Sequence, residues 1–320
     1  MDKPKQDIHF TNMTLDSIGG LHRFSHEAMA TVFEIFIIHD DAGHAQKAAQ
    51  DAFGELDRIE KELSRFIENS DISRINNLSA GESVVVGVDT FKCLELSMLI
   101  YEKTGKAFDV TIGSLLDCWL NDDKTLKTPS KEQLNLAIQN TGMNLLSLDA
   151  DGYTVGVLAD GVKIDVGGIG KGYAIDQMAR QLKEWGINAA LIHGGFSSVL
   201  AIGSPLDFKG WPVTISDPYK PEQILVSLGL KDCAISGSGL QQGMHIIDPR
   251  TAKPVEGRFA AWAVGSDAGI ADGLSTAFMV MSQEQIEQYC SKHGDAKALL
   301  AGKQPGDIVR FGNWEGLIFS

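Results

Sequence analysis

The sequence predicts an α+β fold, and three observations lead to that prediction. Apolar residues recur at helical spacing between Ala45 and Phe66, short strand-like runs follow one another from residue 190 to 264, and strands and helices do not alternate regularly. A doubly wound parallel sheet requires that alternation. The 320 residues allow about two domains or one large one. We expect a flexible leader over 1–20 and a single domain over 21–320.

Strands and helices are mixed in the first half of the chain. A β-branched and aromatic run predicts a strand over 29–38. The helical pattern that follows predicts a long amphipathic helix over 45–66. The other elements expected here are a strand over 84–86, a helix over 91–101, a helix over 131–140 with the capping-box pair Ser130 and Gln133, and a hairpin turn at 151–152.

The second half begins with a glycine-rich segment. We expect a strand over 162–166, a tight turn, and a helix over 174–185 that stops at Gly186. A helix is also expected over 270–281, and Ser282 with Gln285 has the spacing of a second capping box. The short strands expected between these helices lie over 190–192, 199–202, 213–215, 225–228 and 260–264.

Charge and cysteine spacing argue against several classes of function. The chain has 28 Lys and Arg against 42 Asp and Glu, and its net charge of −14 repels nucleic-acid phosphates and anionic membrane surfaces. No apolar run is long enough for a transmembrane segment, and the four cysteines form no C-x-x-C pair, which disfavours a zinc site. The polar start shows no secretory signal. We expect a cytoplasmic protein if the sequence is complete, and a periplasmic or other extracytoplasmic one if a leader was removed.

The glycine-rich segment Asp165–Tyr173 is the first candidate for chemistry. Backbone N–H groups of such a turn approach an anion closely, the helix that follows adds partial positive charge, and Lys171 adds a full charge. The segment is not a Walker A loop, because the spacing to the preceding glycine is wrong and no Ser or Thr follows Lys171. It is not a G-x-G-x-x-G fingerprint either, because Tyr173 stands at the position of the last glycine. That departure argues against a nicotinamide oxidoreductase. The structural alternative is a tight turn between a strand and a helix.

Three further segments carry reactive or ligand-binding side chains. Asp272 and Thr276 stand at i and i+4, so their oxygens share one helix face and suit a hard cation such as Mg²⁺; the alternative is an ordinary acidic helix start. His245 can act as a base near neutral pH, or have a structural role. Phe108 beside Asp109 can flank and hydrogen-bond a flat heterocycle, or be a core residue next to a solvated acid.

Together these segments resemble the ApbE family, the FAD:protein FMN transferases. The resemblance extends from about residue 27 to 316, and its motifs occur in the family's order. Ala30 and Ala252 stand where the family has glycine. The matching segments are Met29–Thr31, Leu63–Phe66 with Ser70, Asp71 and Asn76, Ala107–Asp109, Gly167–Tyr173, Ser236–Gly237, His245–Pro254 and Ala271–Thr276.

The resemblance implies a fold of two tandem T-fold-like halves with a flavin cleft between them. It implies a magnesium site formed by the Gly168 carbonyl, Asp272 and Thr276, and His245 as general base, which makes His245 and Asp272 the catalytic pair. The positions that match flavin-contacting sites of the family are Met29, Phe66, Ala107, Phe108, Asp109, Lys171 and Ile247.

The reaction implied by the resemblance is the Mg²⁺-dependent transfer of FMN from FAD to a Ser or Thr hydroxyl of an acceptor flavoprotein. A phosphoester bond would form and AMP would be released. Two alternatives stay open at this point. Water in place of the acceptor would make the chain a Mg²⁺-dependent FAD pyrophosphatase, and loss of turnover would make it a non-catalytic FAD-binding protein.

Overall fold

The computed structural model describes residues 8–9, 18–121, 123, 125–195, 197–241 and 245–318, and it confirms the α+β fold class. Its largest sheet has eight strands, and every neighbouring pair is antiparallel. The strands, in spatial order, are β16 (Ile308–Phe311), β15 (Lys297–Gly302), β14 (Arg258–Gly265), β11 (Ala234–Gly239), β8 (Ser198–Ile202), β7 (Ala190–Gly194), β3 (Thr31–Ile38) and β2 (Leu21–Ala28).

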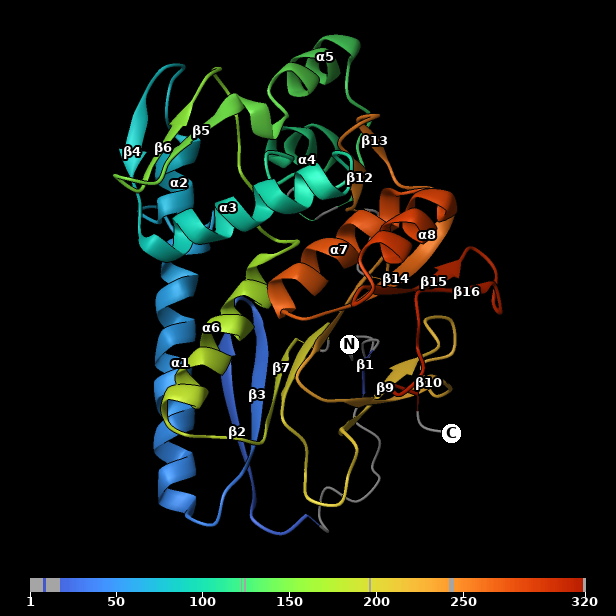
Figure 1. Ribbon diagram of the computed structural model, residues 1–320. Coiled ribbons are helices and arrows are strands. Elements are labelled where there is room, and N and C mark those ends of the chain that lie inside the picture. The colour runs from blue at the N-terminus through green and yellow to red at the C-terminus, as the bar shows by residue number, and fades with distance from the viewer. Residues whose placement is uncertain are drawn as a thin grey trace.

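Helices cover one face of this sheet, as Figure 1 shows. They include the long α1 (Ala42–Leu63), α6 (Gly170–Glu184), α7 (Ala268–Val280) and α8 (Gln283–Lys292). Small residues on the inner face of α1 let it approach the sheet and α6 closely. Nearly every residue of α7 is buried, as its apolar composition on all sides requires. Helix α7 is therefore a central element of the core.

A small sheet covers the opposite face of the large one. It consists of β1 (Ile8–His9), β9 (Trp211–Ser216) and β10 (Ile224–Leu230), so part of the expected leader pairs with β9. Side chains alternate along β14: the methyl groups of Ala261 and Ala263 face the helices, whereas Trp262 packs in the core under the small sheet. The alternation gives the molecule two apolar cores, one on each side of the large sheet.

A third group of elements lies at the top of Figure 1, above α7. Its capping box at Ser130 and its hairpin at 151–152 confirm the sequence predictions. The elements are α2 (Asp71–Asn76), β4 (Ser83–Val85), α3 (Val88–Lys103), α4 (Gly113–Trp119), α5 (Lys131–Gln139), the 3₁₀ turn Met143–Leu145, β5 (Leu146–Asp149) and β6 (Thr154–Val157), with the hairpin β12 (Ile247–Asp248) and β13 (Lys253–Pro254) next to them.

Several expected elements differ from the structure. The helix over 174–185 begins earlier, at Gly170, so Lys171 lies within it. The strand over 29–38 begins at Thr31, because Met29 and Ala30 have φ of 50° and 57° and form the turn between β2 and β3. The helix over 45–66 ends at Leu63, which leaves Phe66 outside it. The strand over 162–166 is wrong: the backbone of Ile164 binds the Asn76 side chain, so only an isolated bridge at Lys163 forms.

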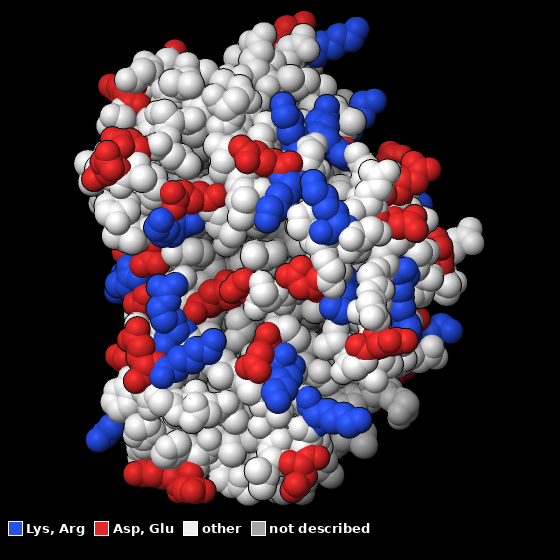
Figure 2. Space-filling view, viewed as in Figure 1, with Lys and Arg blue, Asp and Glu red and all other residues white. Residues whose placement is uncertain are grey.

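The net negative charge does not gather into one patch on the face shown in Figure 2. Acidic and basic side chains are interspersed there, with uncharged surface between them. No helix within the described ranges is both long enough and apolar enough to cross a bilayer.

Candidate active site

The site is built around the first turn of α6. The Asp165 carboxylate accepts the Gly167 N–H at 2.7 Å, and the N–H groups of Ile169 and Gly170 both bond to the Val166 carbonyl. These bonds fold the glycine-rich segment into a tight turn that leads directly into the helix. The turn thereby places Lys171 at the N-terminus of α6, the end of the helix whose dipole stabilises an anion.

Gly168 meets α7 in this turn. A Cβ atom at Gly168 would lie 3.0 Å from Thr276 Oγ1 and 3.3 Å from Phe108 Cε2. Those contacts are tighter than most real Cβ atoms make, so a side chain at this position would displace Thr276 and Phe108 by a few tenths of an ångström. The structure therefore brings Gly168, Phe108 and Thr276 together from three segments that are far apart in sequence.

Asp272 lies one turn before Thr276 on α7 and is only 3% exposed. Its carboxylate accepts the Gly172 N–H at 3.0 Å through Oδ2, and Ser198 Oγ lies 3.3 Å from Oδ1. The Thr276 hydroxyl lies 3.1 Å from Ser238 Oγ. Sequence reasoning missed Ser198 and Ser238, because a serine in a short apolar strand carries no local signal of what it faces.

The donor set of Gly168, Asp272 and Thr276 fits a magnesium ion. A carbonyl, a carboxylate and a hydroxyl are all hard oxygen donors, and Mg²⁺ takes few protein ligands while keeping water and phosphate oxygens. Ser236, which pairs with Ser198 across β11 and β8, has a buried hydroxyl with no hydrogen-bond partner in the structure. Among the described residues no group of three or more His, Cys, Asp or Glu side chains could hold a metal, so a mixed oxygen set is the candidate.

The segment Ala107–Asp109 is buried against this set. Ala107 and Phe108 belong to the main apolar core, and the Phe108 ring edge faces Gly168. Burial raises the pKa of Asp109, and the backbone and hydroxyl of Thr111, which donate to its Oδ1 at 2.8 and 2.5 Å, oppose that rise. Asp109 is thus a buried, bonded acid and not a solvated one.

Phe66 is the most exposed of the predicted flavin-contacting residues, with 83% of its surface open to solvent. The Arg65 guanidinium lies 5.0 Å from its ring centroid. Arg65 also pairs with Asp165 at 3.1 Å, directly before the glycine-rich turn. An aromatic ring held in the open beside an anion-binding turn is suited to stacking on a flat ligand.

Two other predicted flavin contacts lie at the edges of this region. The Met29 N–H donates to Glu60 of α1 at 2.7 Å, which holds the β2–β3 turn near the end of α1. Lys171 is the second residue of α6 and is half-buried, and no ion pair involves it within the described part of the chain. Its ammonium group is available to a phosphate.

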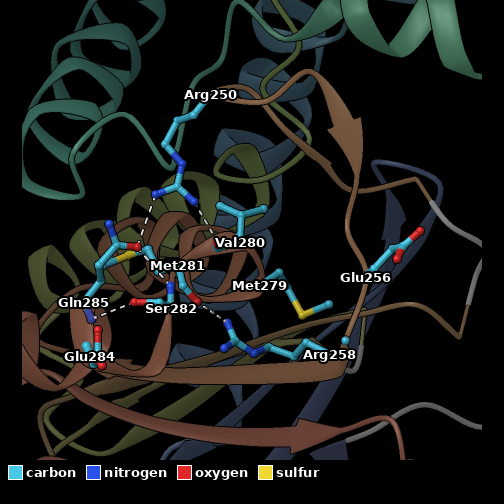
Figure 3. A pocket seen from close by; sticks show the side chains of 10 residues that line it. Arg250, Glu256, Arg258, Met279, Val280, Met281, Ser282, Glu284 and Gln285 are labelled. Carbon is cyan, nitrogen blue, oxygen red and sulfur yellow. Dashed lines mark hydrogen bonds between the residues drawn. The ribbon is translucent and has the colours of Figure 1, made fainter.

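The hairpin that carries His245 and Ile247 bridges two parts of the fold. His245 is half-buried just before β12, whereas Ile247 is buried in a small core with Leu115, Ala137 and Ala252. On the other side, Arg250 pairs with Asp248. Arg250 also donates to the Val280 carbonyl at 2.7 Å (Figure 3). The hairpin is thereby attached to the C-terminal end of the helix that carries Asp272 and Thr276.

A cavity of about 700 Å³ lies beside this attachment. Arg250 and Arg258 both point toward the junction of α7 and α8, as Figure 3 shows. Arg258 donates to the Met281 carbonyl at 2.9 Å, so both guanidinium groups bind carbonyls at the end of α7. Cations at a helix C-terminus stabilise it, which gives these arginines a structural role next to the site.

Comparison with known proteins gives a consistent family match. The profile of the ApbE family matches residues 29–300. A protein of Buchnera aphidicola named FAD:protein FMN transferase is 28% identical over 264 residues, which cover 78% of this chain and 77% of the relative. A protein of Chlamydia muridarum with the same name is 29% identical over 263 residues, covering 78% and 80%.

Solved structures match over a larger share of the chain. The crystal structure of the ApbE protein from Thermotoga maritima superimposes with a TM-score of 0.81 at 28% identity, covering 91% of this chain and 97% of the other. The apo form of a Pseudomonas stutzeri protein described as flavinyl transferase ApbE also gives 0.81, at 23% identity and with 92% and 95% coverage. The second match concerns the fold alone.

Proposed function

The chain belongs to the ApbE family, and on that premise we propose that it transfers FMN from FAD to a Ser or Thr hydroxyl of an acceptor flavoprotein. The observation that carries the proposal is the contact between two helices. The N-terminal turn of α6, an anion site with Lys171, meets the face of α7 that presents Asp272 and Thr276. A dinucleotide with a pyrophosphate needs both an anion site and a cation site.

The residues around Gly168 would hold the metal in this reaction. The Gly168 carbonyl, Asp272 and Thr276 would bind Mg²⁺, which supplies a Lewis acid that neutralises the pyrophosphate. Gly172 and Ser198 orient the Asp272 carboxylate, and Ser238 orients the Thr276 hydroxyl. Lys171 and the positive end of the α6 dipole would attract phosphate oxygens, while Phe66 and Phe108 would contact the flavin.

His245 is the base of the proposed step. An imidazole nitrogen of His245 accepts the proton of the acceptor hydroxyl, and the hydroxyl oxygen forms a bond to the phosphorus on the FMN side of FAD. The bond between that phosphorus and the bridging oxygen breaks, and AMP leaves with the electron pair. The acceptor keeps FMN through a phosphoester bond. Catalysis of this kind depends mainly on positioning and charge stabilisation.

The test uses a flavoprotein subunit that carries phosphoester-linked FMN in its native host. Incubating that subunit with the chain, FAD and Mg²⁺ should add the mass of FMN to one Ser or Thr and release AMP in equal amount. Mass spectrometry of the intact subunit and its peptides measures the first product. Asp272→Ala should abolish the transfer, and full transfer by that variant would contradict the proposed site.

The same mixture without acceptor separates transfer from hydrolysis. We expect AMP release to be at least tenfold slower when the acceptor is left out, because water is not positioned as the acceptor hydroxyl is. Rapid release of AMP and FMN without acceptor would identify a FAD pyrophosphatase instead. Bound FAD with no AMP in either mixture would identify a flavin-binding protein without turnover.

A further inference from the structure

The magnesium residues of the proposed function lie on α7, and the start of that helix is held in an unusual way. Its N-cap residue, Asp267, makes no side-chain bond to the helix, and the Asp267 carboxylate instead accepts the Ser266 hydroxyl. The first N–H groups of a helix have no partner within the helix and need one from elsewhere. For Ala268 and Gly269 that partner is Asp176, in the middle of α6.

Asp176 binds α7 with both carboxylate oxygens. Oδ1 accepts the Ala268 N–H at 2.7 Å, and Oδ2 accepts the Gly269 N–H at 2.8 Å. Hydrogen bonds to an ionised group are shorter and stronger than neutral ones. The two bonds also fix the direction of the carboxylate, so they restrain the position and rotation of the first turn of α7.

A second contact lies one turn earlier on α6. Gly172 and Asp176 stand at i and i+4 and so share a helix face. Gly172 donates to the Asp272 carboxylate, and its position leaves no room for a side chain, since a Cβ would lie 2.1 Å from the Ala268 carbonyl oxygen. Gly172 and Asp176, one turn apart on α6, thus contact Asp272 and the first turn of α7, which are also one turn apart. Such a pair sets the register between the helices as well as their distance.

We infer that Asp176 is a positioning residue for the metal site. By binding Ala268 and Gly269 it holds α7 so that the carboxylate of Asp272 and the hydroxyl of Thr276 stand opposite Gly168, at the start of α6. The hydrogen bonds of Asp176 go to the α7 backbone and not to Asp272 or Thr276. The inference rests on the metal site of the proposed function and adds the residue that arranges it.

The test measures binding of Mn²⁺ as a spectroscopic probe for the Mg²⁺ site, by electron paramagnetic resonance at pH 8 with FAD present. Loss of groups that orient metal ligands weakens binding by about 10- to 100-fold. We expect a tenfold loss for Asp176→Asn, in which one N–H of α7 faces an amide NH₂, and a larger loss for Asp176→Ala. Hydrogen exchange of the Ala268 and Gly269 amides should accelerate in the same order.

Asp51→Asn is the matched control. Asp51 is an exposed carboxylate of α1 that accepts the Trp185 indole N–H at 3.0 Å, at the far end of α6. Its replacement also weakens a link to α6 but should leave Mn²⁺ affinity within twofold of the wild type. A merely structural role of Asp176 would lower the melting temperature of the metal-free protein and leave Mn²⁺ affinity unchanged.

A second variant keeps the carboxylate and crowds its contact with the helix. In Gly269→Ala the new Cβ would lie 3.1 Å from Asp176 Oδ2 and 3.0 Å from Leu96 Cδ2, so the Asp176 carboxylate and the start of α7 must separate by a few tenths of an ångström. Weaker Mn²⁺ binding by this variant supports the inference. Wild-type affinity in both Asp176→Asn and Gly269→Ala would overturn it.

Mn²⁺ binding does not depend on group transfer, so the two proposals can fail separately. If the wild type binds Mn²⁺ through Asp272 but transfers no FMN, only the proposed reaction fails. If FMN is transferred while Asp176→Asn binds Mn²⁺ normally, only the role of Asp176 fails.

Discussion

The sharpest prediction concerns Gly172, where α6 and α7 approach most closely. A methyl group at this position would lie 2.1 Å from the Ala268 carbonyl oxygen, 2.5 Å from its carbon and 2.8 Å from the Asp272 Cβ. Backbone atoms make up the first two contacts, so no side-chain rotation can relieve them. Gly172→Ala must therefore push α7 away from α6 and lengthen the 3.0 Å bond from the Gly172 N–H to Asp272.

The cost follows from three contributions. Overpacking a close contact costs about 1–3 kcal/mol, and the loss of a hydrogen bond to a charged group costs about 1.5–3 kcal/mol. Alanine is favoured over glycine within a helix by about 1 kcal/mol, which offsets part of that cost. We expect Gly172→Ala to lower the free energy of unfolding by about 2–4 kcal/mol, and the displaced Asp272 to weaken Mn²⁺ binding at least tenfold.

Chemical denaturation and the Mn²⁺ titration measure the two effects. Gly54→Ala in α1 is the control, because no atom of another segment would lie within 4 Å of a Cβ added at that exposed helical glycine. It should raise stability by about 0.5–1 kcal/mol through helix propensity alone. A Gly172→Ala protein as stable as the wild type, with unchanged Mn²⁺ affinity, would show that the helix contact has been misjudged.

Three further predictions follow from single residues. Ala30→Gly should raise the free energy of unfolding by about 0.5–1 kcal/mol in thermal melts, because Ala30 is exposed at a φ of 57° that glycine adopts without strain. Ala252→Gly, at φ 55°, should raise the free energy of unfolding by less, since it also loses a buried methyl group. Phe66→Ala should raise the KM for FAD about three- to tenfold by the loss of ring stacking. An unchanged KM would show that Phe66 does not contact FAD. Burial raises the pKa of Asp176 to about 7, against the ordinary 3.8, and the nearby Asp267 and Asp272 add to the rise. Between pH 4 and 7 the folded chain keeps a proton on Asp176 that the unfolded chain releases. The contribution of Asp176 to the free energy of unfolding therefore falls by about 4 kcal/mol as pH rises from 4 to 7. Urea titrations at several pH values should show this fall in the wild type and not in Asp176→Asn.

Local patterns were sufficient to predict most helices and to single out the segments that carry Lys171, Asp272, His245 and Asp109 as candidates. The spacing of Asp272 and Thr276 places both on one helix face whatever the rest of the chain does, and the capping boxes at Ser130 and Ser282 form as the sequence predicts. These features depend on residues within about one helical turn of each other. The fold class followed from the same kind of information.

The rest of the site depends on contacts across long stretches of sequence. Ser198 and Gly172 orient Asp272 from about 70 and 100 residues away, and Asp176 binds the start of α7 over a similar separation. No periodicity encodes such pairs, since they arise only when the sheet and the helices pack. The wrong strand over 162–166 has the same origin: its apolar alternation is local, but the Asn76 side chain that bonds its backbone comes from α2.

The two ends of α7 are held by different groups, so the proposed metal site and the position of the proposed base can be tested separately. Asp176 places negative charge at its N-terminus, and Arg250 and Arg258 donate to the Val280 and Met281 carbonyls at its C-terminus, each complementing the helix dipole. Arg250 alone also lies on the hairpin of His245, where it pairs with Asp248. Its contact with α7 therefore sets the position of the proposed base, His245, relative to the proposed metal residues.

Substitution of each arginine by lysine tests that separation. A lysine at 250 cannot make the forked pair with Asp248 and reach α7 at once, so the His245 hairpin should shift; a misplacement of about 1 Å can cost 100-fold in rate. We expect Arg250→Lys to lower the transfer rate at least tenfold while Mn²⁺ affinity stays within twofold. Arg258→Lys removes a similar helix-capping bond without touching the hairpin, so it should reduce stability and leave the transfer rate nearly unchanged. Equal losses of rate in the two variants would mean that the arginines act only by stabilising α7, and that the hairpin is positioned by its packing on α4.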